Sequence, residues 1–345
     1  MIASFIPHQA DSIDYAYASG SFSVRRGLLL PVQELRRASQ TGKVESLLTA
    51  LNRGAYAPIG SDMSAAEVLV RVESTWQAFL TQATHDLPEG FLPYLLATLD
   101  EKEYAKAGLA QALLGGDGGA HTDGTSNEYA AYCARIQAGE GSPELLTESV
   151  FGVALSDGLK AAQAGASASD AQTVFDFSFE STLEGLATTY GHPAVLAYMD
   201  GLLKLMVAGH ALKMKLRSAS RVGAPLERLL PFLKPGIRES LASIVGRIQG
   251  VPWDMLQPAD LVPEASASVL PVGRRYTAVE RMQMLEDALE LWLVARPEVA
   301  GFEPYGVAIV FAYLMDFRRE VWSLRRLLKA AASAGLRVDG SGGAL

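Results

Sequence analysis

The fold class is decided by residues 303–336, EPYGVAIVFAYLMDFRREVWSLRRLLKAAASAGL. Apolar side chains recur in this stretch at alternating steps of three and four residues, which places them all on one face of a helix. These side chains are Val307, Val310, Leu314, Phe317, Val321, Leu324 and Leu328. The stretch contains no cluster of reactive side chains. It therefore predicts a long helix whose role is packing.

Helical spacing and helix-start signals recur along the rest of the chain. Ser64 with Glu67, and Thr277 with Glu280, have the spacing of a capping box, in which each side chain bonds an orphan amide of the first turn. The tripeptide 142–144, Ser-Pro-Glu, is a third start signal. An early helix is predicted over residues 13–30, with Tyr17, Val24 and Leu28 on one side.

Strand signals are scarce. Residues 173–179, TVFDFSF, alternate as a strand does, but no second strand is available to pair with them. We therefore predict that they begin a helix. The fold class that follows from these patterns is all-α.

Length, charge and composition exclude several classes of protein. A chain of 345 residues is too long for one small core and predicts two or three domains. The net charge of −8 argues against a nucleic-acid partner and against a polybasic lipid anchor.

One cysteine cannot form an internal disulfide, so a reducing cytoplasm is the expected setting. We see no signal peptide, and charges interrupt the most apolar stretch, 193–212, so it predicts a buried helix.

Three segments rich in small residues predict loops or linkers, at 115–127, 164–170 and 257–273. A weak internal repeat accompanies them. In each copy a proline precedes a tyrosine followed by leucine or methionine within a long helix, and the pairs begin at Tyr94, Tyr198 and Tyr313. The repeat predicts three helical units roughly 110 residues apart.

Motifs for chemistry are absent from the sequence. The five histidines have no zinc-site spacing: His8, His85, His121, His192 and His210. The glycines at 115–119 lack the lysine of a phosphate-binding loop. The acidic group at 100–103 contains Lys102 and is interpreted as a solvated helix face, and Cys133 as a small packed residue and not a nucleophile. We predict no catalytic residue, no cofactor and no metal.

Arginines of the last helix leave two alternatives open. Arg318 and Arg325 fall on the edge of the apolar face, seven residues apart, whereas Arg319 and Arg326 point outward. In one alternative, Arg318 and Arg325 lay their stems over apolar surface and pair with acids of a neighbouring helix. In the other, they form a polar rim that binds a partner.

Both ends of the chain resemble the C-type subunit of the bacterial and archaeal V/A-type ATPases (ATP synthases), which is equivalent to the d-type subunit of the eukaryotic V-ATPases. At the C-terminal end the resemblance rests on Pro304, Gly306, Tyr313, Leu314, Arg319, Glu320, Val321, Leu324 and Arg325. At the other end it rests on residues 14–18, DYAYA, and residues 24–29, VRRGLL. Asp100 and Asp200 are not followed by the Asn-Leu that the family repeats, and the Gly-rich insert after Leu114 is unusual.

The resemblance implies an all-α protein with three similar helical domains about a pseudo-threefold axis, forming a funnel. The ranges expected are 1–118, 119–222 and 223–345, with approximate boundaries and with the two terminal helices able to pack together. It implies a non-catalytic rotor protein, present as one copy in the complex, that couples the central-shaft subunits to the membrane proteolipid ring. Its place is cytoplasmic, peripheral to the cell membrane, with no membrane span of its own. Arg25, Arg26, Arg318 and Arg325 are the expected partner-interface residues.

Two other classes stay open. A helical-repeat scaffold for binding proteins would form an open superhelix with a concave groove. An all-α enzyme with a dispersed site would hold residues of shifted pKa in a closed apolar pocket.

Overall fold

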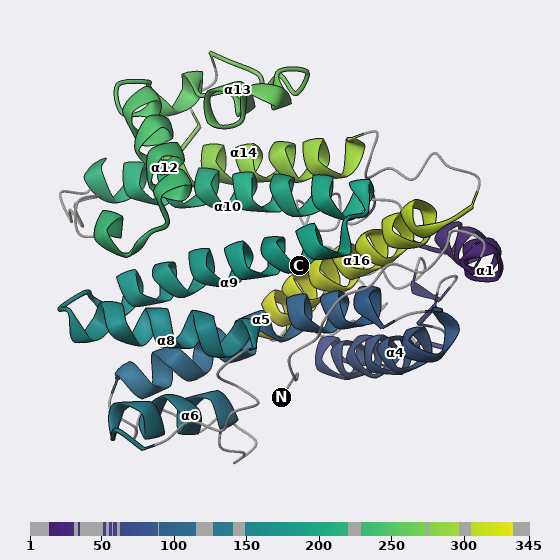
Figure 1. Cartoon of the computed structure of the whole chain (residues 1–345). Coiled ribbons are helices and arrows are strands. Elements are labelled where there is room, and N and C mark those ends of the chain that lie inside the picture. The colour runs from purple at the N-terminus through teal and green to yellow at the C-terminus, as the bar shows by residue number, and fades with distance from the viewer. Residues whose placement is uncertain are drawn as a thin grey trace. The chain divides into compact units, whose positions relative to one another are not determined.

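The chain is all-helical in the computed structural model (Figure 1). The structure describes residues 14–30, 34, 51–52, 55–56, 58–60, 63–88, 90–114, 127–140, 149–219, 229–273, 276–296 and 305–333. Within these ranges lie eleven α-helices, three short 3₁₀ helices and no strand. The predicted fold class is confirmed at this level.

The described residues divide into two compact units. Unit 1 contains those between 98 and 299, and unit 2 contains those between 9 and 97 together with those between 300 and 345. Unit 2 therefore takes its residues from both ends of the sequence. The three predicted domain ranges stay a prediction.

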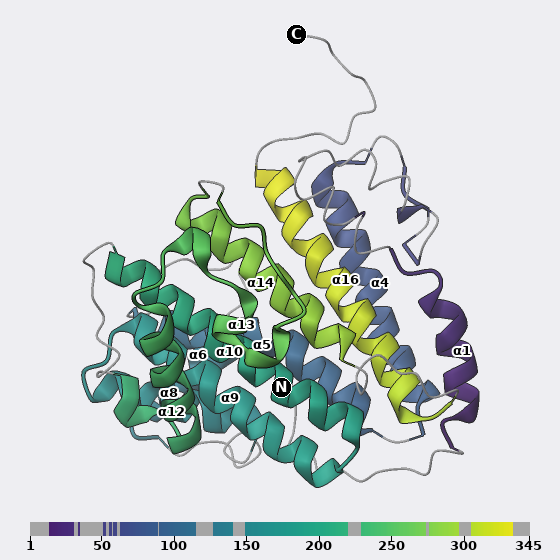
Figure 2. The same cartoon turned by 90° about the horizontal axis from the view of Figure 1, so that it is seen from above.

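Unit 2 is built around α16 (Val307–Ser333), which packs against α4 (Ala65–Asp86) and α1 (Ala16–Arg26), as Figure 2 shows. Every side chain of the predicted apolar seam of α16 is buried. Aromatic rings fill the space between the helices, and the Phe79 ring centroid lies 4.7 Å from that of Phe317. The long packing helix is confirmed, with α4 and α1 as its partners.

The two capping boxes that begin α4 and α14 (Ala278–Ala295) are confirmed. The Glu67 backbone N–H donates to Ser64 Oγ over 3.3 Å, and Glu67 Oε2 accepts from the Ser64 backbone N–H over 2.7 Å. Thr277 and Glu280 make the same exchange. The start signal at 142–144 lies outside the described residues.

Unit 1 is a layered set of helices with α10 (Pro193–Ala219) in its middle, packed against α9 (Ala168–Tyr190), α12 (Pro235–Ile248) and α14. The remaining α-helices of this unit are α6 (Glu128–Gln137), α8 (Val150–Gln163), α13 (Pro258–Leu261) and most of α5 (Phe91–Leu113). The 3₁₀ helices are η1 (Leu230–Phe232), η2 (Trp253–Met255) and η3 (Pro263–Ala265). Leu212, Leu241 and Leu285 are among the buried residues that join α10, α12 and α14.

Several loop and strand predictions can be compared with this unit. Residues 173–179 are helical as predicted, but they lie inside α9 and do not begin it. Of the segment 164–170, only the four residues before Ala168 form a connection, and it joins α8 to α9, which pack together. The second part of the segment 257–273 is irregular as predicted, but its first part contains α13 and η3 and buries Leu261, Val262 and Ala265, so the segment is not a linker. Residues 115–126 lie outside the described part.

The repeat pairs lie on three long helices: Tyr94 on α5 (23 residues), Tyr198 on α10 (27 residues) and Tyr313 on α16 (27 residues). By length and composition α10 could cross a membrane, and half of its most apolar window is buried inside the structure. A core helix of a soluble protein has the same properties.

We expect Leu324→Ala to destabilise unit 2 strongly. Leu324 is fully buried in the seam of α16, and removing such a side chain leaves a cavity at a cost of about 2–5 kcal/mol. Urea unfolding measured by near-UV circular dichroism would report the change. The exposed Trp322 of the same helix is the control, since Trp322→Ala should change the free energy of unfolding by much less. Equal effects of the two variants would contradict the packing described for α16.

Candidate functional site

A buried carboxylate in unit 2 connects segments from both ends of the sequence. Glu320 of α16 is only 3% exposed. Its Oε1 accepts a hydrogen bond from the Tyr56 hydroxyl over 2.8 Å, and its Oε2 accepts one from the Leu30 backbone N–H over 2.5 Å. Both donors lie at least 264 residues away in sequence. Glu320 therefore ties α16 to the chain that follows α1.

Burial dominates the electrostatics of this carboxylate. Desolvation raises the pKa of Glu320 to about 7, although the hydrogen bonds from Tyr56 and Leu30 act in the opposite direction. The Arg319 charge also lowers this pKa, and the Asp316 charge raises it. Near neutral pH, Glu320 is therefore poised between its neutral and ionised forms.

Two further polar contacts hold α1 against α16. The Arg26 guanidinium lies 2.8 Å from Asp316 Oδ2, and the Gly306 N–H donates to Ser19 Oγ over 2.8 Å. Gly306 has a φ of +112°, which a residue with a side chain rarely adopts. This geometry explains why a glycine occupies the position where α16 approaches α1.

The predicted interface arginines Arg25, Arg26 and Arg325 form ion pairs within unit 2. Arg325 donates to both carboxylate oxygens of Glu73 on α4, over 2.8 and 2.7 Å. Arg26 pairs with Asp316, and Arg25 lies 3.7 Å from Asp86. Arg318 is partly buried. For Arg325, the alternative of pairing with an acid on a neighbouring helix is the one that the structure confirms.

Sequence reasoning identified the apolar row of Tyr17, Val24 and Leu28 on the early helix, which is α1, but missed that this row is exposed. Tyr17, Val24 and Leu28 are 83%, 74% and 53% exposed, whereas the buried face carries Tyr15, Ala18 and Phe22. Small exposed residues lie beside them, Ala16, Gly20, Ser23 and Gly27, and two charged residues flank the row, the exposed Asp14 and the partly exposed Arg25. The signal was present as a second apolar row in the same helix. An exposed apolar row of this kind is typical of a contact surface.

The side chains weighed for chemistry are packed. Cys133 is buried, and burial raises the pKa of its thiol to about 12, so the reactive thiolate is disfavoured. His210 is buried with Nε2 3.5 Å from Asp176 Oδ2, and burial lowers the pKa of its imidazole. Within the acidic group, Glu101 accepts a hydrogen bond from Tyr129 over 2.6 Å. The described residues contain no group of three or more ligands placed to hold a metal ion.

Asp176 belongs to a buried ionic cluster that joins α5, α9 and α10. Lys106 Nζ lies 2.6 Å from Asp176, and Lys102 Nζ lies 2.9 Å from Glu180 and 3.4 Å from Asp176. The Lys102 and Lys106 charges, with the His210 hydrogen bond, hold the pKa of Asp176 well below its usual range despite burial. This arrangement binds three helices together.

Comparison with known protein families and with curated proteins returns no match for this sequence.

We expect the stability of unit 2 to fall as the pH rises through 7. The pKa of Glu320 in the folded state, about 7, lies above its ordinary value of 4.5. Its stabilising contribution is therefore complete below pH 4.5 and is lost as the pH rises through about 7, on the order of 3 kcal/mol in all. Denaturant unfolding from pH 4.5 to 8 would measure it. Glu320→Gln should remove this dependence, and parallel profiles for the two proteins would contradict the assignment.

We expect Arg325→Glu to destabilise unit 2 through repulsion from Glu73. The pair is two-pronged and Arg325 is only 16% exposed, so breaking it costs more than breaking a surface pair, roughly 1–3 kcal/mol. The swapped double variant Glu73→Arg with Arg325→Glu should recover most of the loss. Thermal unfolding of the wild type, both single variants and the double variant gives the coupling. Additive effects would show that the pair contributes nothing.

Proposed function

We propose that this protein is a non-catalytic rotor component that couples the central shaft of a V/A-type ATPase to its membrane proteolipid ring. One observation supports the proposal most directly. The two segments that carry the resemblance to this family, at opposite ends of the sequence, pack together in unit 2 as α1 and α16. Within those segments, Arg26, Arg319 and Glu320 all take part in the polar contacts around Asp316 and Leu30.

Such a role requires that twist passes through the protein without slippage between helices. Close-packed interiors are poorly compressible, and the aromatic core of unit 2 is of this kind. Directional contacts oppose sliding of α16 along its neighbours, because the hydrogen bonds to Glu320 and the two-pronged Arg325–Glu73 pair each fix one register. The packing and the polar contacts thus suit a mechanical adaptor.

The proposal includes three similar helical lobes about a pseudo-threefold axis. The tyrosine pairs lie on long helices, α5, α10 and α16, as a repeated helical unit would require. In this arrangement unit 2 would be one of the three lobes. It takes its residues from both ends of the chain, so no single continuous range of residues could form it. The expected setting is the cytoplasmic side of the membrane, within a hetero-complex.

The exposed face of α1 is the surface that we propose for a protein partner. It is apolar and lies on a helix anchored from behind by Phe22, which stacks on Tyr313 at 5.1 Å between centroids. The same face is compatible with a second candidate function, a scaffold that binds other proteins outside any motor. Identification of the partners separates the two.

We expect the tagged full-length protein to co-purify from its native membranes with shaft and proteolipid subunits. The double variant Tyr17→Lys with Val24→Lys should lose this assembly, because burying lysine against an apolar partner is costly. Both positions are exposed, so the fold should be retained. Val70→Lys, at an equally exposed valine of α4, is the matched control.

Three outcomes discriminate. Loss of partners with Tyr17→Lys/Val24→Lys and retention with Val70→Lys supports the α1 surface. If every variant retains the motor subunits, the α1 surface is excluded as the partner site, but the rotor function is still supported. Recovery of neither shaft nor proteolipid subunits with the wild-type protein would rule out the rotor function, and recovery of other proteins would favour the scaffold.

A further inference from the structure

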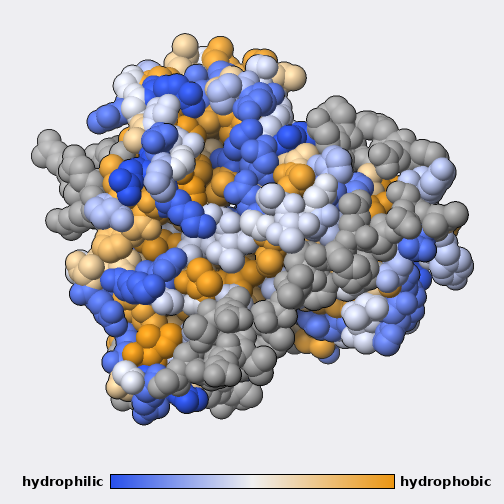
Figure 3. Space-filling model, in the orientation of Figure 1, coloured by the Kyte–Doolittle hydropathy of each residue, from blue (hydrophilic) through white to orange (hydrophobic). Residues whose placement is uncertain are grey.

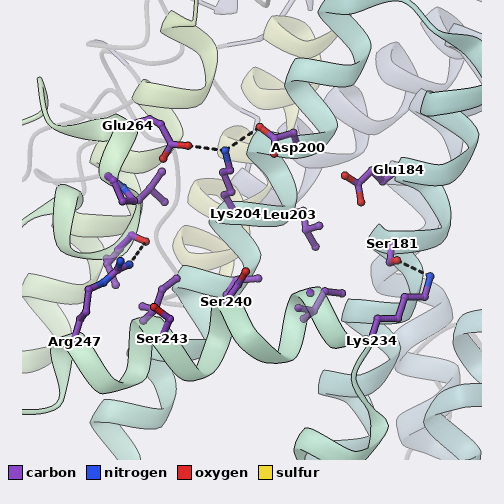
Figure 4. A pocket seen from close by; sticks show the side chains of 17 residues that line it. Ser181, Glu184, Asp200, Leu203, Lys204, Lys234, Ser240, Ser243, Arg247 and Glu264 are labelled. Atoms are coloured by element: carbon purple, nitrogen blue, oxygen red, sulfur yellow. Dashed lines mark hydrogen bonds and ion pairs between the residues drawn. The ribbon is translucent and has the colours of Figure 1, made fainter.

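Unit 1 contains an open groove between α9, α10, α12 and the segment formed by α13 and η3 (Figure 4). Its volume is about 660 Å³, within the range of pockets that bind small molecules. In the space-filling view, apolar atoms are visible between hydrophilic ones on the side of unit 1 where α10 and α12 lie (Figure 3). All of its lining residues belong to unit 1, and the groove has no part in the function proposed above.

The apolar lining of the groove is entirely aliphatic. It consists of Leu203, Val207, Ile237, Ile244, Leu261, Val262 and Pro263. Among the described residues that line the groove there is no phenylalanine, tyrosine, tryptophan or histidine, so these residues offer no ring on which a nucleobase or another flat aromatic ligand could stack. A branched aliphatic surface instead favours a flexible hydrocarbon chain.

At one edge of the groove the charges neutralise one another. Lys204 Nζ lies 2.7 Å from Glu264 Oε1 and 3.2 Å from Asp200 Oδ2, and Figure 4 shows it between the two carboxylates. Asp200 also pairs with Arg296 over 3.0 Å. These groups already have partners of opposite charge, so this edge offers little attraction to a charged ligand.

The edge formed by α12 differs. Lys234 Nζ donates to the neutral Ser181 hydroxyl over 2.6 Å, and Arg247 donates to the Leu261 carbonyl over 3.5 Å. In the described part of the chain, neither cation has a carboxylate within ion-pair distance. The hydroxyls of Ser240 and Ser243 lie between them along α12 (Figure 4). This edge therefore presents two cations, Lys234 and Arg247, that form no ion pair within the described residues and can attract an anion.

One acid lines the groove near Lys234. Burial, and then the charge of Asp200, raise the pKa of Glu184, while the Lys234 charge lowers it. Glu184 therefore competes with an incoming anion for Lys234. Glu184 thus opposes the binding of an anion, and replacing it with a neutral residue tests this effect.

We propose that this groove binds a single-chain amphiphile with an anionic head, of the long-chain carboxylate class, with the carboxylate on Lys234 and Ser181 and the hydrocarbon chain on the aliphatic floor. The charge of Lys234 selects the head, and Leu203, Val207 and Ile244 contact the chain. The ligand displaces water from apolar surface, which supplies most of the binding free energy.

The test uses the full-length protein and dodecanoate at concentrations below micelle formation, measured by isothermal titration calorimetry. We expect saturable binding of one dodecanoate per chain, with much weaker binding of dodecyltrimethylammonium and none of acetate. Those two probes separate the contribution of the head charge from that of the chain. Absence of saturable dodecanoate binding, or equal binding of the cationic amphiphile, would overturn the proposal.

Variants locate the ligand. Lys234→Gln should weaken dodecanoate binding roughly tenfold, the size expected for loss of one charge-assisted hydrogen bond. Glu184→Gln should strengthen binding severalfold, and Ser240→Trp, at an exposed position of α12, should block the groove. Lys213→Gln, at an exposed lysine of α10 outside the lining, is the matched control. Binding unaffected by Lys234→Gln and Ser240→Trp, with unchanged thermal unfolding, would place the amphiphile elsewhere and refute the assignment.

Discussion

Unit 2 depends on one constraint: the Glu320 carboxylate, which is buried together with the apolar seam of α16, needs hydrogen-bond donors. Glu320 lies one position before Val321 and cannot reach solvent once the seam is buried. An ionisable group in such a place is costly unless donors meet it. The Leu30 N–H and the Tyr56 hydroxyl are those donors, and both come from the opposite end of the sequence. Burial of the seam thus determines which part of the chain must lie beside α16, and the hydrogen bonds fix the register at which it does so.

The neighbouring contacts follow from the same constraint. With the chain after α1 held at Glu320, α1 itself is brought within reach of Asp316, where Arg26 pairs, and of the start of α16, where Ser19 meets Gly306. One face of α1 is then committed to the core through Phe22, and the other is left outward with Tyr17 and Val24. The side of α1 that carries Ser19, Phe22 and Arg26 faces α16, and the opposite, apolar side is therefore left exposed.

Local patterns predicted what depends on residues close in sequence. The seam of α16 and the capping boxes at Ser64 and Thr277 each involve contacts within one or two helical turns, so spacing alone was sufficient. The identity of the partners was not predictable in this way. Arg325 pairs with Glu73, 252 residues away in sequence, and the residue spacing within either helix does not indicate which helix it packs against. For α1, the sequence contains two apolar rows, and only the tertiary contacts decide which one is buried.

The segment 257–273 shows why composition misled where packing decides. Its prolines, alanines and serines are typical of a linker, yet side-chain hydrogen bonds tie it together, from Gln257 to both backbone groups of Leu270 and from a buried arginine outside it. Arg281 of α14 is fully buried and donates to the backbone carbonyls of Leu256 and Pro271, close to the two ends of the segment. A buried guanidinium requires several acceptors, and the carbonyls of an irregular segment can supply them because no helix ladder uses them. The hydrogen bonds of Arg281 and Gln257 thus hold this segment in place, and its residues Leu261 and Val262 line the groove in unit 1.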